Sequence, residues 1–232
     1  PQATVQCLDL LEDVPSGLRW GYPATYYVFV RHLSRVWGFC FELLDRRLIY
    51  AVAQPIRRAW NLLVARRFIR WLRATPPDLV IATHFFPADV VSACKQAGWL
   101  TTPLVITVTD LYPHRFWLSP QAEAYVLATN EGALTAKRRG IRSERLHVLG
   151  IPIGSGFGAS FEARDVAQLF QLTPHRRTVL VTSGATTVGP FEPVVEALMG
   201  LEARWPNRIQ LLVVCGANTA AARRRQDSTR RP

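Results

Sequence analysis

Residues 103–110 read PLVITVTD, an apolar run that ends on two polar residues, Thr109 and Asp110. Successive side chains of a strand point to opposite faces of the sheet. Apolar residues at both odd and even positions are therefore typical of a strand that is covered on both faces, as in a parallel sheet. Comparable runs, most of them ending in a polar residue or a glycine, occur at 4–10, 78–84, 125–129, 145–150, 178–184 and 209–216. Segments with helical spacing lie between them at 86–97, 131–140 and 190–203. This alternation predicts an α/β fold with parallel sheets of the doubly wound kind.

A stretch rich in glycine and proline, GIPIGSGFG at 150–158, indicates a domain boundary. We expect an N-terminal domain over 1–150, a linker over 151–163 and a second domain over 164–218. The second domain shows only a strand, a turn, a helix and a strand, which is too little to close an α/β domain. We therefore expect the chain to stop inside that domain, and residues 219–232 to form a disordered tail.

The composition favours an anionic partner. The chain has 28 basic and 17 acidic residues, a formal net charge of +11, which suits nucleic acid, a phosphorylated substrate or an anionic lipid surface. No apolar run reaches the roughly 20 uninterrupted residues of a transmembrane helix. The four cysteines form no C-x-x-C pair, which argues against a zinc knuckle or a disulfide scaffold, and we expect reduced thiols in the core.

Polar residues follow two of the expected strands. Thr109 and Asp110 end one strand and His84 ends the preceding one, with His114 and Trp117 shortly after. Open α/β sheets bind ligands at the carboxyl ends of their strands, so these residues predict a binding crevice with a shared site. Two structural alternatives stay open: Asp110 caps a turn while Trp117 fills an edge of the core, and His84 has a purely structural role.

A small-residue turn with Gly184 and Gly189 joins an expected strand to an expected helix within 183–198. Backbone N–H groups in such a turn, with a helix N-terminus behind them, can hold a phosphate. An ordinary strand-to-helix turn explains the pattern equally well, because neither a G-x-G-x-x-G fingerprint nor a P-loop lysine is present. No D-x-D pair or Cys/His cluster occurs, so we expect no metal.

Residues 19–73 hold eleven arginines and only two acids, Glu42 and Asp45, with aromatic residues interleaved at helical spacing. This pattern suits helices lying on an anionic membrane surface. The residues we expect at that surface are Trp37, Arg57, Arg58 and Trp60. Single-stranded nucleic acid would accept the same surface, and an ordinary solvated basic face also explains it. Nucleic acid is the least favoured partner, since no nucleic-acid-binding motif accompanies the charge.

Four collinear blocks carry a family resemblance: PDLVIATHFFPADVV (77–91), VTDLYPHRFWLSP (108–120), YVLATNEGALTAKRRGI (125–141) and LHVLGIPIGSGF (146–157). They resemble the monogalactosyldiacylglycerol synthase and processive diacylglycerol glucosyltransferase family, over about residues 4–218. The most specific part is T-D-x-x-x-H-x-x-W, filled by Thr109, Asp110, His114 and Trp117.

The resemblance implies a GT-B architecture, in which an N-terminal Rossmann-like domain binds the lipid acceptor and a C-terminal one binds a UDP-sugar. It implies inverting transfer of glucose or galactose to diacylglycerol, without a metal or other cofactor, by a peripheral enzyme on the cytoplasmic face of the membrane. On this basis the expected catalytic residues are Asp110 and His114. The expected acceptor-binding residues are His84, Phe85, Thr109 and Trp117. The expected donor-binding residues are Gly184, Gly189, Gly216 and Asn218.

The chain also departs from the family pattern. The family's opening strand and glycine-rich loop, which ends in a histidine, would precede Pro1, and Ser183, Ala185 and Thr187 stand where the family has glycines. We therefore expect a fragment that is inactive alone. Two alternatives remain: a transferase of the same fold that moves N-acetylglucosamine onto a polyprenyl-linked cell-wall precursor, and a non-catalytic membrane-binding module.

Overall fold

The computed structural model describes residues 3–184, 190–216 and 218. The chain divides into two compact units, one formed by Pro1–Tyr26 with Arg35–Ile153 and the other by Tyr27–Ser34 with Gly154–Pro232. Each unit is described by itself below. The predicted linker over 151–163 stays a prediction. No helix among the described residues is long and apolar enough to cross a membrane.

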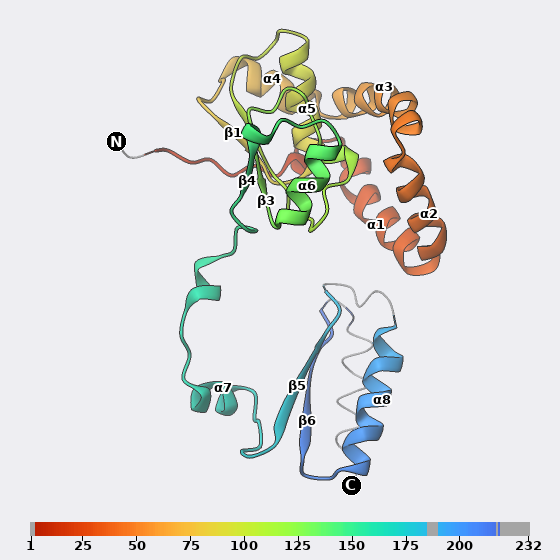
Figure 1. Cartoon of the computed structure of the whole chain (residues 1–232), viewed down its shortest axis with the longest axis vertical. Coiled ribbons are helices and arrows are strands. Elements are labelled where there is room, and N and C mark those ends of the chain that lie inside the picture. Colours follow the sequence, from red (N-terminus) through yellow and green to blue (C-terminus); the bar gives the residue numbers. More distant parts are fainter. Residues whose placement is uncertain (1–2, 185–189, 217, 219–232) are drawn as a thin grey trace. The chain divides into compact units, whose positions relative to one another are not determined.

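A four-stranded parallel sheet forms the centre of the first unit (Figure 1). Its strands are β1 (Val80–Ala82), β2 (Leu104–Thr107), β3 (Ala124–Leu127) and β4 (Leu146–Val148). They lie in the order β1-β2-β3-β4, and every neighbouring pair is parallel. Helix α5 (Phe85–Gln96) connects β1 to β2, and α6 (Asn130–Arg138) connects β3 to β4. The sequence-based predictions of these strands and helices are confirmed.

The core of this unit consists of the strand residues and the helix faces that cover them. Leu104, Ile106 and Leu127 from the sheet are fully buried together with Val90 and Val91 of α5. Both alternations of β2 are largely covered, which explains its continuous apolar run. Cys94 is buried here and Cys215 is buried in the second unit, but Cys7 and Cys40 are exposed, so the prediction of core thiols is wrong for the latter pair.

The predicted strand at 4–10 is wrong. Residues 3–9 are irregular and mostly exposed, and they lead into the 3-10 helix η1 (Leu10–Glu12), which Asp9 caps by accepting the Leu11 N–H. Val5 is 80% exposed, and only Leu10 reaches the core. A strand needs a hydrogen-bonded neighbour, and no strand of the described sheet pairs with this segment.

Four helices form the basic, aromatic segment ahead of the sheet (Figure 1). They are α1 (Ser16–His32), α2 (Ser34–Asp45), α3 (Arg47–Val64) and α4 (Arg66–Ala74). Helix α4 joins the core through Phe68, Ile69 and Leu72. Helix α3 lies against α5, and its polar contacts with that helix are described below.

The second unit contains a two-stranded parallel sheet of β5 (Arg177–Thr182) and β6 (Ile209–Val214), which pair along their full length. Helix α8 (Phe191–Arg204) connects them, preceded along the chain by η4 (Ser155–Gly158) and α7 (Ala163–Leu169). The strands predicted at 178–184 and 209–216 and the helix at 190–203 are confirmed. The small core of this unit consists of Val181, Phe191, Val195 and Cys215.

Candidate functional site

The carboxyl ends of β1 and β2 carry the predicted polar residues. Because the two strands are parallel neighbours, with Ala82 opposite Ile106, the residues that follow them emerge at the same edge of the sheet. His84 follows β1, and Thr109 and Asp110 follow β2. The prediction that these two strand ends share one edge is therefore confirmed. Thr109 is exposed there.

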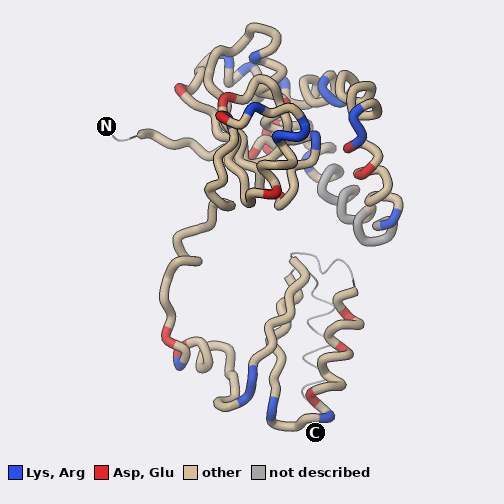
Figure 2. The backbone as a smooth tube through the Cα atoms, in the orientation of Figure 1, with Lys and Arg blue, Asp and Glu red and all other residues tan. Residues whose placement is uncertain are grey.

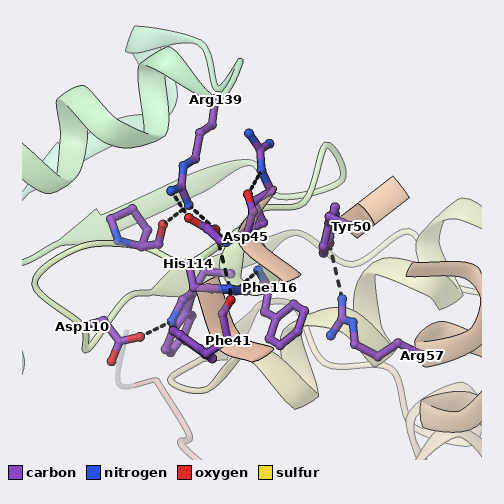
Figure 3. Close-up of polar contacts among 11 residues, drawn as sticks. Phe41, Asp45, Tyr50, Arg57, Asp110, His114, Phe116 and Arg139 are labelled. Carbon is purple, nitrogen blue, oxygen red and sulfur yellow. Dashed lines mark hydrogen bonds and ion pairs between the residues drawn. The ribbon is translucent and has the colours of Figure 1, made fainter. Parts of the chain in front are cut away.

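Asp110 is an exposed carboxylate held by a buried indole. The Trp117 Nε1–H donates to Asp110 Oδ2 across 2.7 Å, as Figure 3 shows for the Asp110 side of the contact. Trp117 itself is 2% exposed and belongs to the core cluster. Its ring offers almost no surface to a ligand, so we revise its predicted role from acceptor contact to positioning Asp110. The hydrogen bond leaves Asp110 Oδ1 as the oxygen available for a ligand.

His84 caps the helix that follows it. Its Nδ1 accepts the Phe86 N–H at 3.2 Å, which satisfies one of the free amides at the start of α5. Since Nδ1 is an acceptor, the neutral ring carries its proton on Nε2 and can donate from there. Removal of part of the ring from water lowers the pKa of His84, and the Asp110 carboxylate opposes this effect. The ring lies 6.1 Å from that of Trp117, centroid to centroid.

Phe85 supplies the apolar wall beside these polar groups. Its ring is half-buried and lies 4.1 Å from the His84 ring, 5.6 Å from Phe116 and 5.8 Å from Trp117, centroid to centroid. The arrangement with Trp117 is edge-on, which is favourable for aromatic pairs. An apolar wall beside a carboxylate and a ring donor is suited to a molecule with a hydroxyl head and an apolar body.

His114 has no ring nitrogen free. Its Nδ1 accepts the Phe116 N–H at 3.1 Å, and its Nε2–H donates to the Phe41 carbonyl at 3.0 Å (Figure 3). Burial lowers the pKa of His114, which keeps the ring neutral, although the Phe41 carbonyl and Asp45 oppose the shift. Both nitrogens would have to leave existing partners to act on a substrate. The predicted catalytic role is therefore revised to a positioning role.

Asp45, at the end of α2, holds the loop that carries His114. One carboxylate oxygen accepts the Arg115 N–H at 3.0 Å and an Arg139 Nη1–H at 2.8 Å, and the other oxygen pairs with Arg139 Nη2. Its backbone carbonyl also accepts from Arg115 Nε at 2.6 Å. Sequence reasoning missed both Asp45 and Arg139. The available signal was the isolation of Asp45 as one of two acids among eleven arginines.

The far end of the same loop is fixed by Tyr125 of β3. Its hydroxyl accepts the Ser119 N–H and donates to the Ser119 carbonyl, both at 2.6 Å. Burial raises the pKa of Tyr125 to about 12, so the hydroxyl keeps its proton for this bond. The loop from Asp110 to Ser119 is thus held at both ends and in its middle, which keeps the Asp110 carboxylate in place.

The two glycines of the second unit that follow its strands lie at one edge of its sheet. Gly184 follows β5 and Gly216 follows β6, with backbone φ angles of +67° and +52°, a region that favours glycine. The Asn218 N–H donates to the Cys215 carbonyl at 3.0 Å, which closes the turn after β6. The fourth predicted donor residue, Gly189, lies outside the described residues. The donor-binding role of this edge stays a prediction.

Two of the four residues expected at a membrane surface point inward instead. Arg57 donates to Asp89 at 3.0 Å and lies 4.6 Å from the Phe116 ring centroid, and Arg58 donates to Gln96. Their guanidinium groups form hydrogen bonds with side chains of α5, so the prediction that these two arginines lie at a membrane surface is wrong. Trp37 and Trp60 are exposed as expected. Across the described residues, no three His, Cys, Asp or Glu side chains are placed to hold a metal.

A parallel sheet with connecting helices and polar residues at its carboxyl edge places the chain among α/β proteins that bind ligands at that edge. The chain belongs to the monogalactosyldiacylglycerol (MGDG) synthase family, whose model matches residues 2–153.

Two similar proteins are the processive diacylglycerol beta-glucosyltransferases of Bacillus cereus (strain AH187) and Bacillus anthracis (strain CDC 684 / NRRL 3495). Each is 29% identical over 196 residues, which cover 84% of this chain and 47% of the relative. The chain therefore spans about half the length of these relatives. Among solved structures it is similar to the apo form of the lipopolysaccharide outer core galactosyltransferase WaaB, with a TM-score of 0.41 and 18% identity over 75% of this chain and 46% of that one.

Proposed function

We propose that the first unit binds diacylglycerol as the acceptor of a hexosyl transfer, and that the donor is UDP-glucose or UDP-galactose. The observation that carries this proposal is the Asp110 carboxylate, which is fixed by Trp117 at a sheet edge shared with His84. The names of the matching family and of the Bacillus relatives support a diacylglycerol acceptor.

In the proposed reaction, the acceptor hydroxyl attacks the anomeric carbon of the sugar with inversion. The hydroxyl must lose its proton as it attacks, so an oxygen that accepts its hydrogen bond assists the reaction. Asp110 Oδ1 is suited to this role because Oδ2 is already bonded to Trp117. His84 Nε2–H then serves as a donor to the acceptor's glycerol oxygens, since its Nδ1 is held by the Phe86 N–H.

The UDP leaving group gains negative charge during transfer, and backbone N–H groups at a helix N-terminus stabilise such charge without a metal. We assign this role to the glycine turns after β5 and β6, with Gly184, Gly216 and Asn218 as the described candidates. The whole protein would work as a peripheral enzyme, because its lipid acceptor resides in a bilayer, and we propose the cytoplasmic face as its location.

The test measures acceptor binding by the purified chain, using dioctanoylglycerol, a short diacylglycerol that needs no bilayer. Titration calorimetry should show binding, whereas a short polyprenyl-linked cell-wall precursor should not bind. Preference for the polyprenyl compound would favour the N-acetylglucosaminyl transferase alternative, and binding of neither would overturn the acceptor assignment. Transfer from radiolabelled UDP-glucose or UDP-galactose is measured in parallel. We expect none from this chain alone, because it spans about half the length of the relatives.

A further inference from the structure

Helix α3 presents apolar residues to the outside and polar residues to the protein. The exposed positions after Arg47 are all apolar: Leu48, Ala51, Val52, Pro55, Ile56, Ala59, Trp60 and Leu63. Leu48, Val52 and Ile56 are 80%, 74% and 72% exposed. The polar residues of the helix are the more buried ones: Tyr50, Gln54, Arg57, Arg58 and Asn61. A helix on the surface of a protein dissolved in water normally shows the opposite pattern.

Buried polar contacts hold α3 in this orientation. Asp89 of α5 is 6% exposed, and its two oxygens accept from Arg57 at 3.0 Å and from Asn61 at 2.7 Å. Arg57 also donates to the Tyr50 hydroxyl at 3.4 Å (Figure 3). Turning α3 so that its apolar face met the protein would leave the Asp89 carboxylate buried without these partners, which is strongly unfavourable. The exposed apolar face is therefore a fixed feature of the fold.

The large exposed apolar residues of α3 form a row that we call the α3 stripe: Leu48, Val52, Ile56, Trp60 and Leu63. Arginines flank both ends of this stripe. Arg46 and Arg47 precede it, Arg66, Arg67 and Arg70 follow it, and all five are exposed. Figure 2 marks the basic positions along the chain in blue. None of these five arginines forms an ion pair with a carboxylate within the part of the chain that the structure describes.

Two open grooves lie beside the end of the stripe. Apolar and cationic side chains share their walls, and the acids Glu12 and Asp13 also line the first groove. One, of about 630 Å³, is lined in part by Trp60, Leu63, Arg66 and Arg67. The other, of about 640 Å³, is lined in part by Leu63, Arg66 and Arg70. Leu63 and Arg66 are common to both grooves. An apolar ridge bordered by cations matches the boundary between acyl chains and anionic headgroups.

We propose that α3 lies in the plane of an anionic bilayer, with the α3 stripe in the acyl boundary and the flanking arginines on headgroup phosphates. The proposal deepens the proposed function, since a diacylglycerol acceptor is itself a bilayer lipid. A second copy of the chain fits this face poorly. Both ends of the stripe are basic, so stripes that pair in either direction bring arginines against arginines.

Vesicle flotation with the full chain tests the surface. Wild type should bind vesicles that contain phosphatidylglycerol, and bind less in high salt or to pure phosphatidylcholine. The double substitution V52E/I56E should lower binding by about tenfold or more, because it places charges where apolar side chains enter the lipid. Leu134→Glu on α6, another exposed leucine, is the matched control and should leave binding unchanged. Reversal of charge at Arg66 and Arg67 should remove the salt dependence, whereas Arg138→Glu should not.

An environment-sensitive fluorophore locates the contact directly. In a chain with Cys7→Ser and Cys40→Ser, the remaining natural cysteines are buried, so a probe can be attached at Val52→Cys or at Leu134→Cys. Addition of anionic vesicles should shift the emission of the Val52 probe to the blue and leave that of the Leu134 probe unchanged. An unshifted Val52 probe on a bound chain, or no vesicle binding at all, would overturn the proposal. A concentration-dependent dimer that V52E/I56E abolishes would do the same.

Dioctanoylglycerol binding separates this proposal from the function on which it rests. V52E/I56E should keep wild-type affinity for that soluble acceptor, because the stripe does not contribute to the site at Asp110. Loss of vesicle binding with acceptor binding intact supports the docking surface. Wild-type chain that binds vesicles through α3 but fails to bind dioctanoylglycerol would leave the docking surface standing and remove the acceptor assignment.

Discussion

Trp117 and Asp110 form the central contact of the candidate site, since the buried indole N–H donates across 2.7 Å to an exposed carboxylate. The pair lies at the carboxyl edge of the sheet. Asp45 bonds the loop at Arg115, between the two residues, and Tyr125 bonds it at Ser119, just after Trp117. A rigid core residue therefore orients a solvent-facing acid, an arrangement suited to binding a hydroxyl group.

Replacing Asp110 with Asn should weaken acceptor binding while the fold stays intact. The Asn side-chain carbonyl can still accept from Trp117, but the free oxygen and the negative charge are lost. We expect dioctanoylglycerol binding to weaken by about 1.5–3 kcal/mol, the range for hydrogen bonds to a charged group. Titration calorimetry measures the effect, with Asp78→Asn at another exposed position as the control. Equal affinity in the wild type and D110N would reduce Asp110 to a structural cap.

Asp45→Asn should destabilise the first unit. The carboxylate is 26% exposed and pairs with Arg139, which is 19% exposed, so its loss leaves a partly buried guanidinium without its partner. We expect the free energy of unfolding to fall by about 2–3 kcal/mol, measured by urea denaturation. Glu144→Gln removes an exposed ion pair with Arg142 and should cost at most about 0.5 kcal/mol. Similar losses for both variants would contradict the anchoring role of Asp45.

Gly132→Ala should perturb the site from the opposite side of the loop. A Cβ at Gly132 would lie 2.8 Å from the Leu111 carbonyl oxygen, next to Asp110, and a backbone atom cannot move aside cheaply. We expect a loss of about 1–3 kcal/mol in stability, together with weaker acceptor binding. Gly200→Ala in α8 meets nothing within 4 Å and should instead stabilise by up to about 1 kcal/mol. Thermal melts and dioctanoylglycerol titrations of both variants check the contrast.

Acidification from pH 7 to 5 should destabilise the first unit through two of its histidines. Burial lowers the pKa of both His84 and His114 in the folded chain below the ordinary value of 6.5. Well above pH 6.5 both rings are neutral in either state, so they add no pH dependence there. As the pH falls through 6.5, the unfolded chain binds protons that the folded chain excludes, and stability is lost.

Urea unfolding at a series of pH values from 7 to 5 measures this loss. His114→Gln should flatten the profile, because the Gln amide can still donate to the Phe41 carbonyl and does not titrate. His84→Gln should flatten it as well, and the double variant most of all. A stability that rises between pH 7 and 5 in the wild type would contradict the direction of both pKa shifts.

Much of the fold could be predicted from local pattern. The continuous apolar run of β2 and the helical spacing of α5 specify buried strands and covering helices, because both faces of a parallel sheet must be covered. Residues 4–10 show the limit of this argument. They have a strand-like composition, but no neighbouring strand pairs with them, and pairing is a property of the whole sheet.

The candidate site could be predicted only in outline. The positions of His84 and Asp110 follow from the rule that parallel strands end at one edge. That rule does not reveal which way a side chain points. His114 and Trp117 are buried and support their neighbours, and Asp45 bonds the same loop at Arg115 from 70 positions earlier in the chain. Contacts over such separations leave no periodic signal in the sequence.

The sequence by itself determined the α/β class, the family and the basic character of the helical segment, since these depend on composition, spacing and short motifs. Only the tertiary structure decided which arginines are available to a partner. Arg57 and Arg58 turn inward because α5 presents Asp89 and Gln96 to them, and this turns the apolar residues of α3 outward. The spacing of residues reveals that a helix has an apolar and a polar face. Which of the two is buried depends on the chemistry of the surface against which the helix packs.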